Sequence, residues 1–329
     1  MDLSIIIVNW NSYEFLDNCI KSIIDYTRGI SFEIIVVDNA SFDGCSKVVD
    51  KYIGVAKLVL SESNIGFARA NNLGYRVSGG NTLLFLNPDT IILGESLEKL
   101  HKTLLSLENC GCLGCMVLNK DGTIQTSCIQ TFPTIINQLL NAEYIRNLFP
   151  KARIWGIEPL FESNEIAHEV EAIAGSCLMV RRDVFEKVGL FSEDYFMFAE
   201  DIDLCYKMRQ FGYRNFYIGK ASIVHYGGGS TKLTGKGYFS AVLKCESIKI
   251  FMKKFYGNIY SIGFVLTSFI VSIVRVLLLL IVYPLSFINF FDRGNIYHRL
   301  NKWKHIFLWS LGMERWVKKY RGIIRTNSI

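Results

Sequence analysis

The sequence predicts an α/β fold, in which a mostly parallel central sheet is flanked by helices and followed by a C-terminal helical appendage. Short β-branched runs recur in the first ninety residues, and a segment with helical periodicity follows the first of them. Strands that alternate with helices form mostly parallel sheets. The 329 residues, half of them hydrophobic, suffice for one large domain and an appendage. We expect this domain over 1–245 and a basic, apolar helical region over 246–329.

Four strands are expected in the first ninety residues. The run LSIIIV at 3–8 is β-branched and bounded by polar residues, and the apolar positions of residues 15–24 then recur at helical spacing. Further buried strands are predicted at 33–37, 57–60 and 82–86. In such sheets ligands bind at the carboxyl ends of strands, and Asn9, Asp38 and Asp89 fall just beyond three of these ends.

Asp38 is a candidate contact to a nucleotide base. The sequence contains neither GxGxxG nor GxxxxGK[ST], which excludes the dinucleotide fingerprint and the P-loop. An ionised carboxylate only accepts hydrogen bonds, so it can pair with the imide N–H of uracil or thymine but not with the acceptor nitrogen of cytosine. The alternative is a turn-forming Asp after a strand.

The tripeptide Asn87-Pro88-Asp89 is a candidate metal site. A metal that bridges a diphosphate prefers carboxylate oxygen, and Pro88 restricts the backbone that presents Asp89. One carboxylate alone is a poor site, but His225, in IVHYGGGST, can complete it, because imidazole ligates Mn²⁺ and the following glycines let backbone approach a phosphate. The alternative is a structural histidine after an apolar strand.

Three acids, Glu200, Asp201 and Asp203, stand directly before a helical pattern that ends at Gly212. The dipole of a helix favours ionised carboxylates at its N-terminus, whereas their mutual repulsion raises at least one pKa. This combination suits a general base, and we expect Asp201 to fill that role. The alternative is that the acids merely cap the helix.

The cysteines do not predict a metal site. The segment CGCLGC holds Cys110, Cys112 and Cys115 at a spacing that does not match a zinc motif, so we expect buried residues of a strand that ends in a hairpin turn at 119–122. The nine cysteines are odd in number and scattered, which argues against a disulfide framework. With no secretory signal expected at the N-terminus, these observations favour the cytosol.

With these residues in place, the chain resembles the family 2 glycosyltransferases of the GT-A fold, particularly the rhamnosyltransferase-like branch. The resemblance covers roughly residues 2–245 and rests on motifs in the expected order: IIIVNWNS, VVDNAS, NIGFARANNLG, FLNPD, DGTIQ, AGSCLMVRRDVFEKVGLFSEDYF, FAEDIDLCYKMRQFG and HYGGGS. It favours the catalytic interpretation of the acids. Breaking a sugar–diphosphate bond leaves negative charge that Mg²⁺ or Mn²⁺ stabilises, and a single displacement by one activated hydroxyl inverts the anomeric centre.

The resemblance also implies roles for individual residues. Asp201 would deprotonate the acceptor hydroxyl with Glu200 beside it, orienting sugar or acceptor. Asp89 would bind the divalent metal, with His225 nearby. The nucleotide-sugar pocket would be formed by Asn9, Asp38, Asn64, Gly66, Phe67, Asn71 and Asn87. Many members have Asp-x-Asp where this chain has Asn-Pro-Asp, so the metal's ligands depart from the common pattern. The implied donor is dTDP-rhamnose, with a UDP-sugar as the alternative.

The C-terminal region is expected to associate with a membrane. Residues 246–329 hold 13 of the 36 Lys/Arg but only 3 of the 30 Asp/Glu, which favours an anionic membrane surface over nucleic acid. The almost wholly apolar residues 259–291 would form a helix of about 50 Å, against about 30 Å of bilayer hydrocarbon, with Arg275 near its middle. Basic residues on both flanks therefore favour a re-entrant hairpin or in-plane helices at the cytoplasmic face, and a lipid-linked saccharide acceptor.

Two other functions are compatible with this pattern. A membrane-anchored carbohydrate-binding or scaffolding protein could use the same frame in an inactive form, but loss of the metal acid or of the base would then be expected. Asp89 and Asp201 are both present. A nucleotidyltransferase is disfavoured, because the acids after residue 199 would have no role in attack on an α-phosphate.

Overall fold

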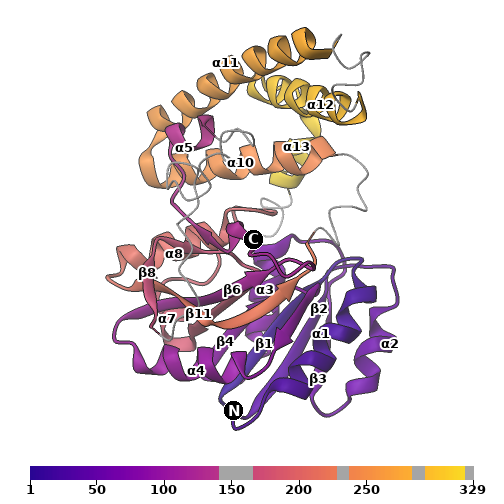
Figure 1. Ribbon diagram of the computed structural model, residues 1–329, viewed down its shortest axis with the longest axis vertical. Coiled ribbons are helices and arrows are strands. Elements are labelled where there is room, and N and C mark those ends of the chain that lie inside the picture. Colours follow the sequence, from indigo (N-terminus) through magenta and orange to yellow (C-terminus); the bar gives the residue numbers. More distant parts are fainter. Residues whose placement is uncertain (141–165, 228–236, 284–292, 323–329) are drawn as a thin grey trace.

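The protein has two layers, a sheet domain and a layer of C-terminal helices that lies beyond the carboxyl ends of the parallel strands (Figure 1). The computed structural model describes residues 1–140, 166–227, 237–283 and 293–322. Within these ranges, nine strands form one sheet and two short strands, β7 (Ile129–Gln130) and β9 (Ala172–Ile173), pair separately.

The first four predicted strands are confirmed and lie side by side. They are β1 (Leu3–Asn9), β2 (Phe32–Asp38), β3 (Ala56–Leu60) and β4 (Thr82–Leu86), in the order β3-β2-β1-β4. All of them pair in parallel, and Leu3 aligns with Phe32 on one side and with Thr82 on the other. Every residue of β1 is buried, which is the pattern of a strand covered on both faces.

The other half of the sheet contains antiparallel pairs, so the expected sheet flanked by helices is present in a mixed form. β10 (Cys177–Arg181) lies between β4 and β6 (Cys110–Leu118) and runs antiparallel to both. β11 (Arg214–His225) runs parallel to β6 but antiparallel to β5 (Thr90–Leu93) and β8 (His168–Val170). An apolar run predicts a strand but not its direction, because direction depends on pairing between distant segments.

The helices of the sheet domain are α1 (Tyr13–Tyr26), α2 (Cys45–Val49), α3 (Phe67–Arg76), α4 (Ser96–Ser106), α7 (Arg182–Lys187) and α8 (Glu200–Gln210), with 3₁₀ turns at Asp50–Tyr52 and Thr126–Cys128. α1 is the helix predicted after the first strand and buries Leu16, Ile20 and Ile23 at helical spacing. α8 is the helix predicted after the acids, and Gly212, with φ of +84°, follows its end.

The interpretation of the cysteine-rich segment as a buried strand is confirmed by β6. Cys110, Cys112 and Cys115 are all buried. After the strand, the N–H of Gly122 donates to the carbonyl of Asn119 at 2.9 Å in the predicted turn. The segment therefore contributes core packing.

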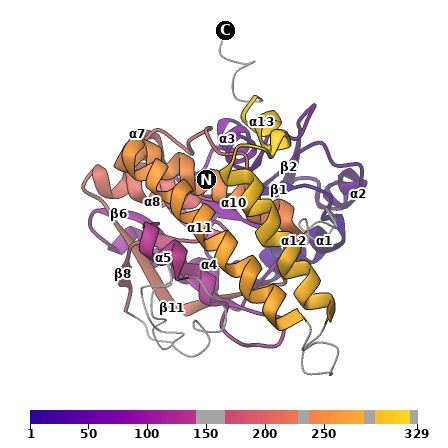
Figure 2. The same ribbon diagram turned by 90° about the horizontal axis from the view of Figure 1, so that it is seen from above.

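The second layer consists of α10 (Gly237–Tyr256), α11 (Asn258–Val282), α12 (Arg293–Ser310) and α13 (Arg315–Gly322), with the short α5 (Ile135–Leu139) beside them. Seen from above, α11 and α12 lie side by side across the molecule (Figure 2). The boundary expected after Cys245 falls inside α10, so this helix joins the two layers without a break.

α11 is one uninterrupted helix of 25 residues, and its length is therefore about 37 Å. It is shorter than the length expected for 259–291 because it ends at Val282, and Pro284 lies outside the described residues. Among the described residues, α11 is the one helix long and apolar enough to cross a membrane. The Arg275 guanidinium lies 5.7 Å from the ring centroid of Trp303 on α12, so the charge faces a neighbouring helix.

Candidate active site

A cavity of about 390 Å³ lies between the carboxyl ends of the parallel strands and α10. Lys244 and Ile248 of α10 line it on the side of the helical layer. The cavity brings together most of the residues singled out in the sequence: Asn64, Gly66, Phe67, Asn87, Asp89, Glu200, Asp201 and His225.

A strained loop before α8 places the acids at the start of this helix beside the cavity. Phe198 and Ala199, just before the helix, have φ of +70° and +63°, a region that non-glycine residues occupy at a cost of roughly 1 kcal/mol each. The carbonyl of Phe196 accepts the N–H of Phe67 at 2.8 Å. A Cβ on Gly66 would lie 2.5 Å from that same oxygen, so only glycine fits there. The loop thus joins the acid helix to the start of α3.

Asp201 is fixed in direction by backbone donors. Its Oδ2 accepts the N–H of Gly175 at 2.9 Å, and its Oδ1 accepts the N–H of Ile202 at 2.8 Å. Burial raises the pKa of Asp201, and these two N–H groups partly oppose the increase. A positioned carboxylate of raised basicity is what general-base catalysis requires.

Glu200 is a different kind of carboxyl group. It is only 6% exposed, and among the described residues its Oε2 has no hydrogen-bond partner. Burial, followed by the charge of neighbouring Asp201, raises the pKa of Glu200 well above its ordinary value. A protonated Glu200 can donate a hydrogen bond into the cavity, which suits a role in orienting sugar or acceptor.

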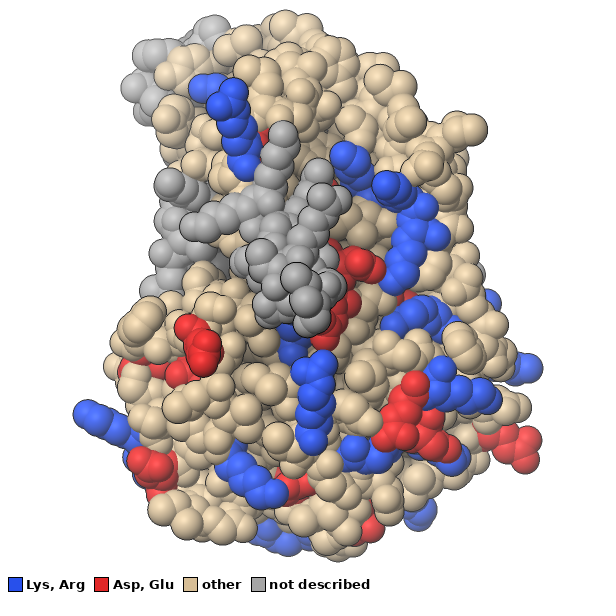
Figure 3. All heavy atoms as spheres, turned by 180° about the vertical axis from the view of Figure 1, so that it is seen from behind, with Lys and Arg blue, Asp and Glu red and all other residues tan. Residues whose placement is uncertain are grey.

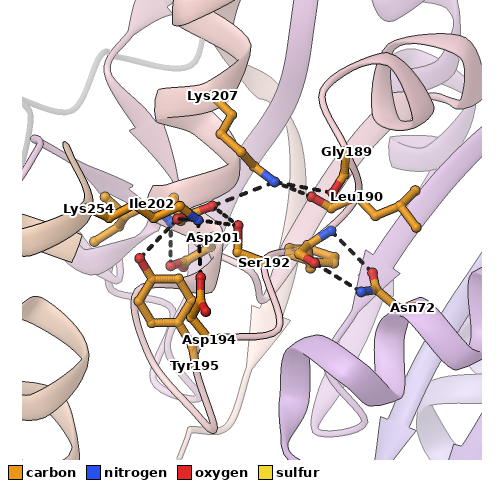
Figure 4. A network of polar contacts seen from close by, with 12 residues as sticks. Asn72, Gly189, Leu190, Ser192, Asp194, Tyr195, Asp201, Ile202, Lys207 and Lys254 are labelled. Atoms are coloured by element: carbon orange, nitrogen blue, oxygen red, sulfur yellow. Dashed lines mark hydrogen bonds and ion pairs between the residues drawn. The ribbon is translucent and has the colours of Figure 1, made fainter. Parts of the chain in front are cut away.

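The third acid, Asp203, does not line the cavity. Its buried carboxylate accepts hydrogen bonds from the Tyr195 hydroxyl at 2.9 Å and from Lys254 Nζ at 2.8 Å. Lys254 belongs to α10 and also donates to Ser192 Oγ at 2.7 Å (Figure 4). Asp203 therefore attaches the acid helix to the helical layer.

Asp89 and His225 line the same cavity side by side, with 3.1 Å between Oδ1 and Nε2. Gln125 Oε1 is 2.7 Å from His225 Nδ1, and Asn87 Nδ2 is 3.2 Å from Nε2. A neutral imidazole with its proton on Nδ1 satisfies both contacts, because Nδ1 then donates to Gln125 and Nε2 accepts from Asn87.

In that tautomer Nε2 of His225 carries no proton and lies beside a carboxylate oxygen of Asp89. A cation bound there would take the Nε2 lone pair in place of the hydrogen bond from Asn87. Two electron-rich atoms at this distance favour a cation between them, and a carboxylate with an imidazole fits Mg²⁺ or Mn²⁺. Among the described residues no group of three or more His, Cys, Asp and Glu is assembled for a metal. Substrate phosphates and water would complete the coordination, as is usual for Mg²⁺.

One wall of the cavity contains Asn64, Gly66 and Phe67, and it is held by Asn39. Asn39 Nδ2 donates to Asn64 Oδ1 at 3.0 Å, and its Oδ1 accepts the N–H of Ile65 at 2.9 Å. Asn64 Oδ1 also accepts the N–H of Gly66 at 3.0 Å. These hydrogen bonds fix the conformation of this wall of the cavity.

Asn9, Asp38 and Asn71 do not line this cavity. Asp38 Oδ1 accepts the N–H of Ser41 at 2.9 Å, which is the turn-forming alternative. Asn9 Nδ2 donates to Ser41 Oγ at 3.1 Å in the same loop. Asn71 Nδ2 donates to the Phe67 carbonyl of its own helix at 3.0 Å. Asn9 and Asp38 therefore hold the loop at Ser41, and Asn71 stabilises the first turn of α3.

Sequence reasoning missed Asn39, Gln125 and Lys244 as residues of this site. The signal for Gln125 was its place just after the turn at 119–122, where the Gln125 N–H donates to the Val117 carbonyl at 2.8 Å and the side chain meets His225. Lys244 belongs to no sequence motif, and only the fold places it at the cavity.

The arrangement of strands and helices is that of the GT-A-like fold. The mannosyltransferase PcManGT from Pyrobaculum calidifontis, solved with GDP-Man and Mn²⁺, matches 96% of this chain and 87% of its own with a TM-score of 0.54 at 14% identity. GalNAc-T7, solved with UDP, GalNAc and Mn²⁺, matches 68% of this chain and 43% of its own with a TM-score of 0.53 at 17% identity. These similarities show the fold.

Residues 4–189 match the family model described as "Glycosyl transferase family 2", and the chain belongs to this family. The identification made from the sequence motifs is thereby confirmed. Similar relatives include the low-salt glycan biosynthesis hexosyltransferase Agl10 of Haloferax volcanii, which is 31% identical over 231 residues, covering 68% of this chain and 66% of that protein.

Two further relatives are named as rhamnosyltransferases. The N-acetylglucosaminyl-diphospho-decaprenol L-rhamnosyltransferase of Mycobacterium tuberculosis is 28% identical over 211 residues, covering 60% of this chain and 67% of that protein. The rhamnosyltransferase WbbL of Escherichia coli is 27% identical over 206 residues, covering 59% of this chain and 73% of that protein.

Proposed function

We propose that the protein is an inverting, metal-dependent glycosyltransferase that moves a sugar from a nucleoside diphosphate to a hydroxyl of a lipid-linked saccharide. The observation that carries the proposal is that one cavity holds a candidate base and a candidate metal pair. Asp201 is the base, and Asp89 with His225 is the pair. The inactive-frame alternative is disfavoured because both functions are assembled around the same space.

The residues divide the reaction between two ends of the cavity. A Mg²⁺ or Mn²⁺ ion on Asp89 and His225 would neutralise charge on the diphosphate leaving group. Asp201 takes the proton of the acceptor hydroxyl as its oxygen attacks the anomeric carbon and the bond to the diphosphate breaks. Because the attacking and leaving oxygens lie on opposite faces of the sugar, the anomeric configuration inverts. Glu200 holds the sugar or the acceptor by a hydrogen bond.

The relatives' names support the choice of substrates. Two are rhamnosyltransferases, and one of these names a diphospho-decaprenol acceptor. We therefore favour dTDP-rhamnose, with a UDP-sugar as the alternative, and a role in cell-surface polysaccharide synthesis. The apolar α11 and the basic C-terminal region support action at the cytoplasmic face of the membrane.

A donor screen with the purified protein and the variant Asp201→Asn tests the proposal. Transfer should fall about 10²–10⁴-fold in Asp201→Asn, because the base is lost, while nucleotide affinity stays near normal. Asp50→Asn, at an exposed position in the 3₁₀ turn Asp50–Tyr52, is the control and should keep full activity. Wild-type turnover in Asp201→Asn would remove this residue from its role, and no transfer from any nucleotide sugar would reject the function.

A further inference from the structure

A second cavity, of about 180 Å³, lies within the helical layer beside the active-site cavity. It is lined by residues of α5, α10, α11 and α12. Lys244 and Ile248 of α10 line both cavities, so the two spaces share a wall. The reaction proposed at Asp201 makes no use of this second space.

The lining of the second cavity is mostly apolar. Its apolar members include Leu139, Phe264, Val271, Trp303 and Ile306. The hydroxyls of Thr267 and Ser268 also line it, but they donate to the carbonyls of Gly263 and Phe264 in their own helix. Because both hydroxyl protons are donated within α11, neither is available to a ligand. This side of the cavity therefore presents a mainly apolar surface.

The charged groups that line the second cavity are both cations. They are Lys244 and Lys302, and no Asp or Glu of the described residues lines it. Lys302 Nζ lies 5.7 Å from the ring centroid of Trp303, so its charge sits close to the apolar wall. From behind, Lys and Arg side chains gather where the two layers meet, whereas the top of the helical layer shows few charges (Figure 3). Ammonium groups beside an apolar chamber match an anion that carries hydrocarbon.

We propose that the second cavity binds the diphosphate and adjoining hydrocarbon of the lipid-linked acceptor, with Lys244 and Lys302 paired to the phosphates. The assignment rests on the proposed function, since it says how the same site holds its acceptor. Because Lys244 lines both cavities, a diphosphate paired with it places the attached saccharide beside the active-site cavity that contains Asp201. The hydrocarbon continues along α11, whose exposed apolar residues include Leu266, Ile270, Val274, Leu277 and Ile281.

Binding of farnesyl diphosphate to the full-length protein in detergent tests the assignment. Calorimetry in EDTA keeps a metal on Asp89 and His225 from contributing. Wild type should bind farnesyl diphosphate more tightly than pyrophosphate or farnesol, because the cavity offers cations and apolar surface together. Lys302→Glu should weaken binding at least tenfold. Lys304→Glu, an exposed change on the same helix outside the cavity, should leave it unchanged.

A second pair of variants tests the cavity by volume. Ser268→Trp fills it from α11 and should abolish binding of farnesyl diphosphate, whereas Ile259→Trp, at an exposed position of the same helix away from the cavity, should not. Equal melting temperatures and equal donor affinity show that each variant is folded. A Lys302→Glu protein that binds like wild type overturns the assignment. So does equal affinity for pyrophosphate alone, or equal competition by dihexanoyl-phosphatidylglycerol, which would make the cavity a contact for bilayer lipid.

The outcomes also separate this assignment from the proposed function. Transfer to a soluble acceptor that lacks lipid reports the reaction at Asp201 alone. If such transfer occurs but Lys302→Glu leaves farnesyl diphosphate binding intact, only the assignment of the second cavity is wrong. If wild type transfers no sugar from any donor, the proposed function is wrong whether or not the cavity binds the probe.

Discussion

At the start of α8, two neighbouring carboxyl groups differ in the donors that reach them. Asp201 receives the backbone N–H groups of Gly175 and Ile202, whereas Glu200 Oε2 receives no hydrogen bond from the described residues. Donors stabilise the ionised form and burial destabilises it. Asp201 therefore ionises more easily than Glu200, and Glu200 keeps its proton to higher pH. When two neighbouring carboxyl groups have different pKa values, the one that ionises more easily can act as the base and the other can donate a hydrogen bond.

Glu200→Gln should stabilise the protein at neutral pH. The folded-state pKa of Glu200 is raised, so its favourable contribution is present below the ordinary value of 4.5 and is lost as pH rises through the folded-state pKa. Gln carries no charge to bury, and the melting temperature should rise by about 1–2 °C at neutral pH, the effect of about 1 kcal/mol in a chain of this size. The gain should disappear at acid pH. Melting curves across pH, with the exposed Glu108→Gln as control, would contradict this if the two variants behaved alike.

Gly66→Ala should lower the free energy of unfolding by more than the backbone strain of alanine at this positive φ explains. Gly66 has φ +86° and ψ 169°, and Gly257 has nearly the same angles, φ +92° and ψ 170°. A Cβ at Gly66 meets Phe196 O at 2.5 Å, whereas a Cβ at Gly257 meets nothing within 4 Å. The difference in unfolding free energy between the two Ala variants should be about 1–3 kcal/mol, the usual cost of overpacking. Urea unfolding measures it, and a raised KM for the donor should accompany the loss at Gly66. Equal costs would show that the loop moves aside freely.

At the scale of elements, the sequence predicts those strands and helices whose position depends on a local pattern of residues. β-branched runs locate β1 to β4, and acids followed by helical periodicity locate α8. Both signals depend only on residues that are close together in the sequence. The antiparallel entry of β10 between β4 and β6, and the position of α10 over the cavity, depend on contacts between distant segments. The same holds within the site. Asp89 and His225 could be paired from their chemistry, whereas Asn39 and Gln125 act by supporting other residues and have no motif of their own.

Lys254→Met should loosen the attachment of α10. Lys254 reaches the fully buried Asp203 at 2.8 Å with a side chain that is only 31% exposed. Removing this partner should cost about 1–3 kcal/mol. The cost stays below that of a fully unpaired buried charge because Lys207 Nζ remains 3.6 Å from Asp203 and the hydroxyls of Tyr195 and Ser192 still donate to it. Transfer should also weaken, since α10 lines the cavity. Lys253→Met, the exposed neighbour, is the control. Denaturant unfolding that gives both variants the same stability would contradict the role of Lys254.

At the scale of the whole molecule, both ends of the helical layer return to the sheet domain. Ser247 of α10 donates to the Met197 carbonyl, in the loop before α8, at 2.7 Å. Near the end of α12, Trp309 Nε1 donates to Glu246 of α10 at 2.8 Å, and the ring of Tyr320 in α13 lies 4.5 Å from that of Phe196. The path therefore leaves the sheet domain through α10 and comes back to it through α13.

This path predicts that the C-terminus lies in the cytosol together with the sheet domain. If α11 crossed the bilayer, α12 would have to return through it, yet α12 exposes Lys302 and Lys304, which are costly in hydrocarbon. An in-plane or re-entrant hairpin avoids this cost, because Lys304 meets headgroups, Lys302 stays at the second cavity, and the apolar face of α11 meets lipid. A tag fused after Ile329 should be digested by protease in sealed inside-out vesicles without detergent, as should a control tag before Met1. Digestion of the control with protection of the C-terminal tag would show a crossing.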